Sequence, residues 1–435
     1  MKLNLVKNYK TYDRYKNSGA EWLGEIPEDW QIKPLKNFFI FKKDSNAGLY
    51  TKEYIGQHKG KYPVYSGQTE NSGIMGMIET YNFDYKKVIL TTTVGARAMS
   101  NMLIGGKFSL SQNCLIMILK NNDNLNYLYY QLFPLFEYER NSIPSHMQPS
   151  LRVEDLNTFK IAQPQIYIQQ KIADYLDEKT EKIDKIIANK KKLIELLEEK
   201  KKTVINKAVT KGLDDNVEMK DSGVEWLGEI PEDWCSEKLK TRIKKHFSGV
   251  WGDEKKEDIN DYLCLRVADF NYPKLSFRNI ETTRNVDPKD QHRILKNGDI
   301  LMEKSGGGDK QPVGRAILFK SDKGMFCANF IEVLRFKKEV DSRFFVYLMS
   351  ALYKIGLNKR FIKQNTGIQN LDLNYFFNEE VPIPPKETQQ KIADYLDEKT
   401  EDIDKTIKKI NKSIYLLTEY KSSLISHVVT GKIKI

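Results

Sequence analysis

The chain has 435 residues and a formal net charge of +11, and 40% of its residues are hydrophobic. No apolar run reaches the roughly 18–20 residues of a membrane-spanning helix. The first stretch, MKLNLVKNYKTYDRYK, has no apolar signal-peptide core, so we expect a cytoplasmic protein. The basic balance favours a polyanionic partner, which leaves DNA, RNA and an anionic membrane open.

The first feature in chain order is a tryptophan segment that occurs twice. The stretch SGAEWLGEIPEDW ends at Trp30, and SGVEWLGEIPEDW, which differs at one position, ends at Trp234. We expect both stretches to be structural clasps, in which the indoles bury apolar area against helix ends. They belong to an N-terminal segment over residues 1–30 and to a second segment over residues 213–234.

Residues 31–165 predict a first α/β module with mixed strands. KYPVYSGQ (61–68) and KVILTTTVGARA (87–98) are strand-like runs that end in turn residues, and KFSLSQNCLIMIL continues into a buried strand. The helix-like stretch NLNYLYYQLFPLFEYER follows. A Pro-containing exit, IAQPQIYIQQ, then leads into the next element, where proline fits the start of a helix. The region is long enough to close a core of its own.

A heptad pattern predicts a long helix over residues 166–212. Heptads with charged flanks indicate a coiled-coil seam, and polar residues within such a seam help to fix its register. The two rows of the seam are Leu176, Ile183, Lys190, Leu197 and Val204, and Thr180, Ile187, Ile194, Lys201 and Ala208.

The second half of the chain repeats this order. A second variable region (235–385) contains the Gly-rich, basic stretch GDILMEKSGGGDKQPVGRAILF, and a C-terminal long helix is predicted over residues 386–435. The stretch QQKIADYLDEKTE begins at Gln169 and again at Gln389. The two copies are 220 residues apart, whereas solenoid repeats recur every 20–50 residues or so. The duplication therefore predicts two similar modules related by a pseudo-two-fold axis, and not a solenoid.

The two long helices are expected to pair with each other, since a mostly polar helix is marginal alone. The residues between Gly212 and Ser222 span at most about 30 Å, so the second region begins near the far end of the first helix. The second helix can then run back antiparallel, which predicts a rod with one module near each end. A seam between two copies of the chain is the alternative. The lysines at 190–192 and 200–202 are interpreted as a solvated face first and a phosphate or acidic-protein contact second.

Motifs of the common catalytic classes are missing from the sequence. It has no G-x-S-x-G elbow, HExxH, Rossmann G-x-G-x-x-G or NPPY-type methylation motif, and SGGGDKQPVGR lacks the G-x-x-x-x-G-K-[ST] of a phosphate loop. The histidines are scattered and the cysteines form no CxxC pair, which argues against a zinc ribbon. The sequence therefore predicts a binding protein with no metal site, no bound cofactor and no catalytic residues.

The duplicated tryptophan segment, the Pro-rich exit, QQKIADYLD and the long helix together resemble the specificity subunit of type I restriction–modification systems. The resemblance covers nearly the whole chain, and the paired order of its parts makes it specific. It implies two target recognition domains, each of which reads half of a split, asymmetric DNA site, and an antiparallel helical spacer between them.

The resemblance also implies partners. Two modification subunits would carry S-adenosylmethionine and methylate adenine N6, and restriction subunits that use ATP and Mg would join them. The chain itself would be a non-catalytic DNA-binding subunit without a membrane partner. A cytoplasmic coiled-coil scaffold whose two modules bind proteins is the alternative.

Base readout requires Arg, Lys, Asn, Gln, Ser or Thr side chains that reach base edges, with other basic groups on phosphates. Loops flanked by strand or proline signals supply such residues in both modules, and a solvated loop is the plainer interpretation of each. The candidates are Thr92, Thr93, Arg97, Ser145, His146 and Gln148 in the first module, and Lys304, Ser305, Lys310, Gln311, Arg315, Gln364, Asn365 and Gln369 in the second.

Overall fold

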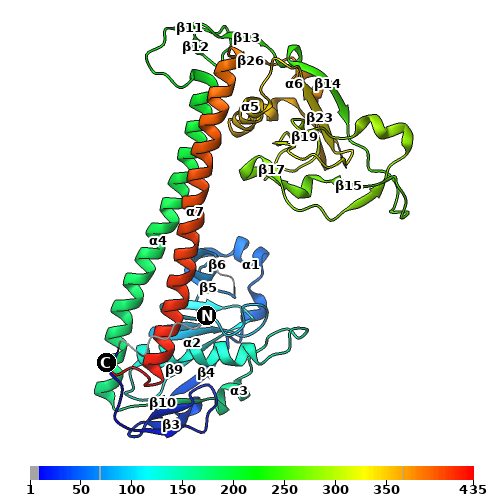
Figure 1. Ribbon diagram of the computed structural model, residues 1–435. Coiled ribbons are helices and arrows are strands. Elements are labelled where there is room, and N and C mark those ends of the chain that lie inside the picture. Colours follow the sequence, from blue (N-terminus) through cyan, green and yellow to red (C-terminus); the bar gives the residue numbers. More distant parts are fainter. Residues whose placement is uncertain (1–8, 68–69, 366) are drawn as a thin grey trace. The chain divides into compact units, whose positions relative to one another are not determined.

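A computed structural model describes residues 9–67, 70–365 and 367–435 (Figure 1). The chain divides into two compact units: unit 1 comprises Met1–Lys191 and Asn411–Ile435, and unit 2 comprises Lys192–Ile410. Within the described ranges, no helix combines the length and the apolar character that a membrane crossing requires. The predicted strand over 61–68 corresponds to part of β5, and Gln68 lies outside the described residues.

Unit 1 contains a six-stranded sheet in the order β4-β9-β7-β8-β5-β6. Its central strand β7 (Phe83–Thr92) is apolar on both faces, because successive side chains point to opposite sides of a sheet. Ile89 packs into the core beneath α2, whereas Val88 and Leu90 pack into a second cluster on the other face. The other elements are β1 (Tyr15–Asn17), β2 (Glu25–Pro27), β3 (Gln31–Pro34), β4 (Phe39–Lys42), α1 (Lys52–Gln57), β5 (Lys59–Tyr65), β6 (Ile74–Ile78), β8 (Asn101–Leu110), β9 (Cys114–Leu119), α2 (Leu125–Asn141), α3 (Val153–Thr158) and β10 (Lys160–Gln163).

Unit 2 contains a four-stranded sheet in the order β14-β23-β19-β21. All its pairings are antiparallel, as are those of β4-β9-β7-β8, so the same four-stranded arrangement occurs in both units. On the central strand β19 (Ile300–Glu303), Ile300 faces the core that contains α5, and Leu301 faces a separate cluster. The other strands are β11 (Met219–Asp221), β12 (Glu229–Pro231), β13 (Cys235–Lys238), β14 (Ile243–Ser248), β15 (Asp261–Leu265), β16 (Phe270–Asn271), β17 (Ser276–Phe277), β18 (Thr283–Asn285), β20 (Ser305–Gly306), β21 (Ala316–Leu318), β22 (Met325–Cys327), β23 (Ile331–Phe336), β24 (Ile362–Asn365), β25 (Ile368–Leu371) and β26 (Glu380–Ile383), and the helices are α5 (Ser342–Lys354) and α6 (Leu373–Phe376).

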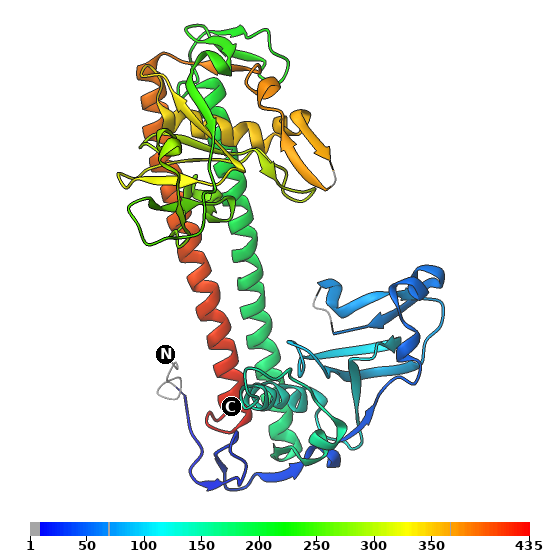
Figure 2. The same cartoon turned by 90° about the vertical axis from the view of Figure 1, so that its right-hand side faces the viewer.

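The long helices α4 (Ile166–Lys211) and α7 (Lys386–Val429) each contribute to both units. In each unit their parts lie side by side, α4 in green and α7 in red (Figures 1 and 2). The beginning of α4 packs on the end of α7 in unit 1, and the end of α4 packs on the beginning of α7 in unit 2. The helices are therefore antiparallel and the seam lies within one chain, as the heptads and the short linker after Gly212 together predicted, and not between two copies of the chain.

The polar seam residues have two different roles. Lys421 donates to Asp184 in unit 1, and Lys201 donates to Asp404 in unit 2, so both lysines fix the register of the helix pair. Thr180 instead meets the hydroxyl of a tyrosine on α2 at 3.0 Å. This threonine therefore helps to attach the module to the helix as well as lying in the seam, a role that the heptad did not predict.

The duplicated stretch QQKIADYLDEKTE attaches a module to each helix. The side-chain carbonyl of Gln169 accepts from the backbone N–H of Asn124, the N-cap of α2, at 2.9 Å, and Gln389 accepts from Asp341, the N-cap of α5, at 3.0 Å. Further contacts repeat in the same way. Tyr130 donates to Asp177 at 2.6 Å, Tyr347 donates to Asp397 at 2.8 Å, and Thr180 and Thr400 bond the same two tyrosines.

The tryptophan segments close the helix ends, as the sequence predicted. Trp30 packs with the end of α7 in unit 1, and Trp234 packs with the end of α4 in unit 2. A lysine just past or at each helix end donates to the matching backbone carbonyl: Lys432 to that of Glu25, and Lys211 to that of Glu229.

Candidate nucleic-acid interface

In unit 1, three segments meet where β7 ends and β9 begins. The Thr93 backbone N–H donates to the carbonyl of Asn113, and its carbonyl accepts from Leu151 N–H, both at 2.8 Å. Val94 and Ser150 then form a single antiparallel bridge. We call this region, residues 93–98, 113 and 144–151, the first edge.

Unit 2 repeats this arrangement. The Lys304 backbone N–H donates to Phe330 at 2.9 Å, and its carbonyl accepts from Leu371 N–H at 2.8 Å. Ser305 and Asn370 pair across β20 and β25, in the place of Val94 and Ser150. We call residues 304–312, 330, 362–365 and 367–371 the second edge.

A glycine with positive φ follows the paired position on each edge. Gly95 has φ +98° and Gly306 has φ +116°, a backbone conformation that residues with a Cβ rarely adopt. The loop that follows is longer on the second edge. On the first edge the chain returns to hydrogen-bond with β7 at Ser100, whereas on the second edge it returns to hydrogen-bond with β19 only at Arg315. The two edges therefore share a backbone plan and differ in loop length and side chains.

The predicted residues of the first module divide into buried and exposed groups. Thr92 and Thr93 are buried, and the Thr92 hydroxyl donates to the carbonyl of Arg97, so these threonines shape the turn. The Arg97 side chain is exposed, as are those of Ser145, His146 and Gln148. A Cβ built on Gly95 would lie 3.8 Å from the Gln148 amide nitrogen, so the two loops of the first edge touch.

The second module places its predicted residues on both sides of a small sheet. Lys310, Gln311 and Gln364 are exposed and Ser305 is half-buried, whereas Gln369 is buried and accepts from Val313 N–H at 3.4 Å. The side chain of Asn365, at the end of β24, lies outside the described residues.

Two predicted basic residues of the second module are engaged in ion pairs. Arg315 donates to both carboxylate oxygens of Glu303, at 2.8 and 3.2 Å, and the two side chains are only 12% and 2% exposed. Lys304 donates to Glu332 at 3.0 Å and to the Ser248 hydroxyl at 2.6 Å. Arg315 is thus a buried structural residue, and Lys304 is held beside the second edge by its hydrogen bonds.

Sequence reasoning missed Asn370 and Ser150. Asn370 is exposed between two buried residues, Gln369 and Leu371. A strict strand alternation over 368–371 would have assigned 369 and 371 to one face and Asn370 to the other. The alternation of the strand therefore indicates Asn370 as the outward-facing residue, whereas the predicted candidate, Gln369, faces inward.

An ion pair also determines the charge beside Asn370 in the sheet β20-β25-β24. Lys363 donates to Asp372, and this hydrogen bond lowers the pKa of the carboxyl group and raises the pKa of the ammonium. Both groups are therefore charged at neutral pH, and Lys363 is held on the strand next to Asn370.

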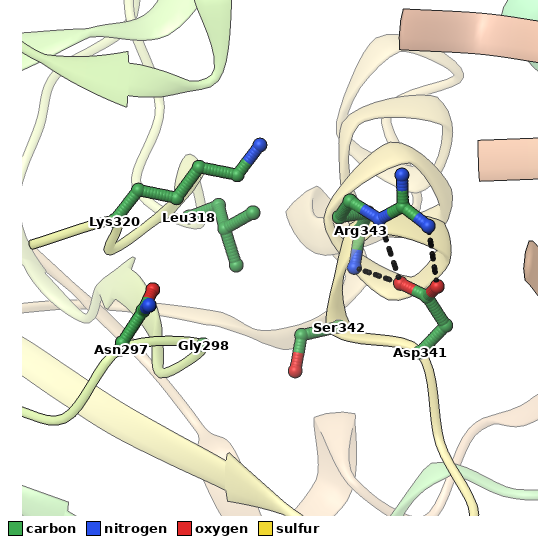
Figure 3. A pocket seen from close by; sticks show the side chains of 7 residues that line it. All are labelled: Asn297, Gly298, Leu318, Lys320, Asp341, Ser342 and Arg343. Carbon is green, nitrogen blue, oxygen red and sulfur yellow. Dashed lines mark hydrogen bonds and ion pairs between the residues drawn. The ribbon is translucent and has the colours of Figure 1, made fainter. Parts of the chain in front are cut away.

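A surface pocket of about 280 Å³ lies at the opposite end of β19, between Asn297, Lys320 and the N-terminus of α5 (Figure 3). Arg343 lines it but is held by Asp341, at 2.9 Å, and by Asp394 and Asp397 on α7. These bonds raise the pKa of Arg343, with the hydrogen bond to Asp341 as the largest cause. The guanidinium therefore ties α5 to α7, and we assign no ligand to the pocket.

Cys114, Cys264 and Cys327 are buried, whereas Cys235 is exposed. Burial raises the pKa of Cys114 to about 11 and that of Cys264 to about 12, so neither is a thiolate at neutral pH. Across residues 9–67, 70–365 and 367–435, no group of His, Cys, Asp and Glu side chains could hold a metal ion.

Comparisons with known proteins agree with this architecture. The model of the type I restriction modification DNA specificity domain matches residues 27–199 and 253–416. The specificity subunit of the type I restriction enzyme MjaVIII of Methanocaldococcus jannaschii is 26% identical over 424 residues, which cover 94% of each protein. The MpnII specificity subunit of Mycoplasma pneumoniae is 32% identical over 130 residues, 29% of this chain and 37% of that protein.

The fold also occurs among solved structures. One chain, from a structure concerned with complex assembly and conformational transition of the type I R-M system, superposes with a TM-score of 0.66 at 12% identity. The match covers 93% of this chain and 98% of that one, so the similarity of fold extends over both modules and both long helices.

Proposed function

Because this chain belongs to the type I restriction–modification DNA specificity family, we propose that it recognises a bipartite, asymmetric DNA site and directs adenine-N6 methyltransferase subunits to it. Each module reads one half-site with its edge. Recognition of a DNA sequence is the family's role, and the division into half-sites is the proposal.

One observation carries it: two edges with the same backbone plan present different side chains. Val94 and Ser150 form the bridge of the first edge, and Ser305 and Asn370 form the pair of the second. Identical surfaces would read identical half-sites, whereas different polar groups on a shared scaffold favour different bases. A duplicated reader with divergent edges therefore supports an asymmetric site.

The charge of the chain supports the same partner. A net charge of +11 favours binding to a polyanion, and phosphate contacts position a protein on DNA without specifying sequence. Exposed Arg97, Lys310 and the tethered Lys363 lie on the edges and can supply such contacts.

The chemistry belongs to partners in this proposal. Two modification subunits bind S-adenosylmethionine and transfer the methyl group, and restriction subunits that use ATP and Mg cleave DNA when they join the complex. This chain contributes the target and the geometry.

The test is to map N6-methyladenine across the genome in cells with and without this chain, alongside its modification subunits. We expect methylation at one split motif that disappears when the chain is deleted. Methylation that is unchanged by the deletion would contradict the proposal and favour the scaffold alternative. A change in both half-sites after exchange of residues 31–165 alone, for the matching region of a relative, would contradict one half-site per module.

A further inference from the structure

Asn370 lies on β25 between two buried residues. Its neighbours Gln369 and Leu371 are 5% and 6% exposed, and the Gln369 side chain accepts from Val313 N–H. Because the side chains of a strand alternate between its two faces, the burial of these neighbours places the Asn370 side chain on the outward face of the sheet β20-β25-β24.

The Asn370 amide is also oriented. The Ser305 hydroxyl donates to Asn370 Oδ1 at 2.7 Å from the paired position on β20. A carbonyl oxygen has two lone pairs, so Oδ1 can accept a second hydrogen bond while Nδ2 donates one. The amide therefore offers an acceptor and a donor side by side, in one fixed plane.

This pairing of groups matches adenine. In the major groove adenine presents N6–H₂ as a donor and N7 as an acceptor, and an asparagine can bond both at once. The groove admits a two-stranded β-ribbon, and β24 and β25 pair as such antiparallel strands, with the two-residue strand β20 beside β25 at Asn370. Ile368, on the same outward face and 48% exposed, provides an apolar contact of the kind that a thymine methyl group accepts.

We propose that Asn370, oriented by Ser305, is a specificity-determining residue that reads an adenine in the half-site of the second module. The inference rests on the proposed function and adds to it the residue and the base. The counterpart pair on the first edge, Val94 and Ser150, lacks an amide, so the first module reads its corresponding position differently.

The experiment uses the full chain co-expressed with its modification subunits, and methylated motifs are mapped by sequencing. Asn370→Ser is expected to reduce discrimination by about 5–150-fold at one position of one half-site, the loss that corresponds to one bidentate base contact. The other half-site stays unchanged. Asn297→Ser, at the opposite end of β19, is the matched control and is expected to keep the wild-type motif.

A second variant separates reading from folding. Ser305→Ala keeps the Asn370 amide but removes its orienting hydroxyl, so we expect a smaller loss at the same motif position. A wild-type motif in Asn370→Ser, or loss at different positions in the two variants, would overturn the inference while leaving the proposed function intact. A wild-type chain that imposes no motif at all would instead overturn the proposed function.

Discussion

Arg315 illustrates, at the scale of a residue, how an arginine in a Gly-rich basic loop can support the second edge without facing outward. Its guanidinium bonds Glu303, whose side chain is 2% exposed, because the β19–β21 register brings these residues together across the hairpin. The sequence identified the loop but not this partner, since a hairpin register depends on how the loop closes. Asn370, by contrast, could have been predicted, because alternation with the apolar, buried Leu371 assigns it to the outward face.

Replacement of Arg315 by Ala is expected to destabilise unit 2 by about 3–5 kcal/mol, because it leaves the Glu303 carboxylate buried without its ion partner. Lys310→Ala, in the exposed part of the same loop, is the matched control and is expected to change stability by less than about 0.5 kcal/mol. Urea denaturation of the three proteins measures both values. Equal midpoints for the two variants would contradict a structural role for the ion pair.

At the scale of the elements, the docking of the long helices explains why one stretch of sequence is duplicated without change. QQKIADYLDEKTE presents the same docking groups to α2 in unit 1 and to α5 in unit 2, through Gln169 and Gln389. Heptad spacing predicted the seam, because burial at every third or fourth residue is a local property of a helix. The short linker after Gly212 predicted its antiparallel direction. Neither could predict the docking, because the donors lie in modules of different sequence.

Gln389→Ala should loosen the start of α5 and leave α2 unaffected. The Asp341 backbone N–H loses its acceptor, which lowers the local opening free energy by about 1–3 kcal/mol. Hydrogen exchange of peptides over 336–347 and 119–130 measures both helix starts in one sample. Gln169→Ala should give the reverse pattern, and an equal response of both peptides to either variant would refute local docking.

The two seam ion pairs should differ in strength. Lys201 and Asp404 have side chains that are 15% and 27% exposed, whereas those of Lys421 and Asp184 are 28% and 57% exposed. Exposed pairs contribute about 0.2–1 kcal/mol and are screened by salt, so Lys201–Asp404 should couple more strongly and resist salt better.

Double-mutant cycles with alanine at each pair, measured by denaturation at low salt and at about 1 M salt, compare the couplings. A larger or less salt-sensitive coupling for Asp184–Lys421 would show that exposure does not set their strength.

For the whole molecule, the duplication in the sequence predicted two modules, and the shared strand order β4-β9-β7-β8 and β14-β23-β19-β21 agrees with it. The additions to this common sheet were not predictable. Unit 1 extends it with β5 and β6, whereas unit 2 carries a separate sheet, β18-β15-β22. Strand pairing joins segments distant in sequence, so residue patterns can indicate strands without giving their neighbours.

Under the proposed function, the long helices set the gap between half-sites. Insertion of one heptad after Leu197 and one after Leu417 keeps the seam in phase and lengthens each helix by about 10 Å. DNA rises about 3.4 Å per base pair, so the preferred gap should grow by roughly 3 base pairs.

The same insertion rotates one half-site by about 100° around the duplex, which should reduce affinity without altering either half-site sequence. Methylation of a library with randomised gaps measures the preference. An unchanged gap would mean that the helices do not determine the spacing.

The segments of chain that form each unit determine when each unit can complete its folding during synthesis. Unit 2 is one continuous stretch, whereas the core of unit 1 joins Trp30 to Leu424, Val428 and Ile433, nearly 400 residues later. A ribosome that makes about 5–20 residues per second releases the whole of unit 2 before it reaches these last residues. The packing of Trp30 against the end of α7 is therefore completed only when translation ends, and a chain cut short before residue 424 would lose the α7 residues that join the core of the module synthesised first.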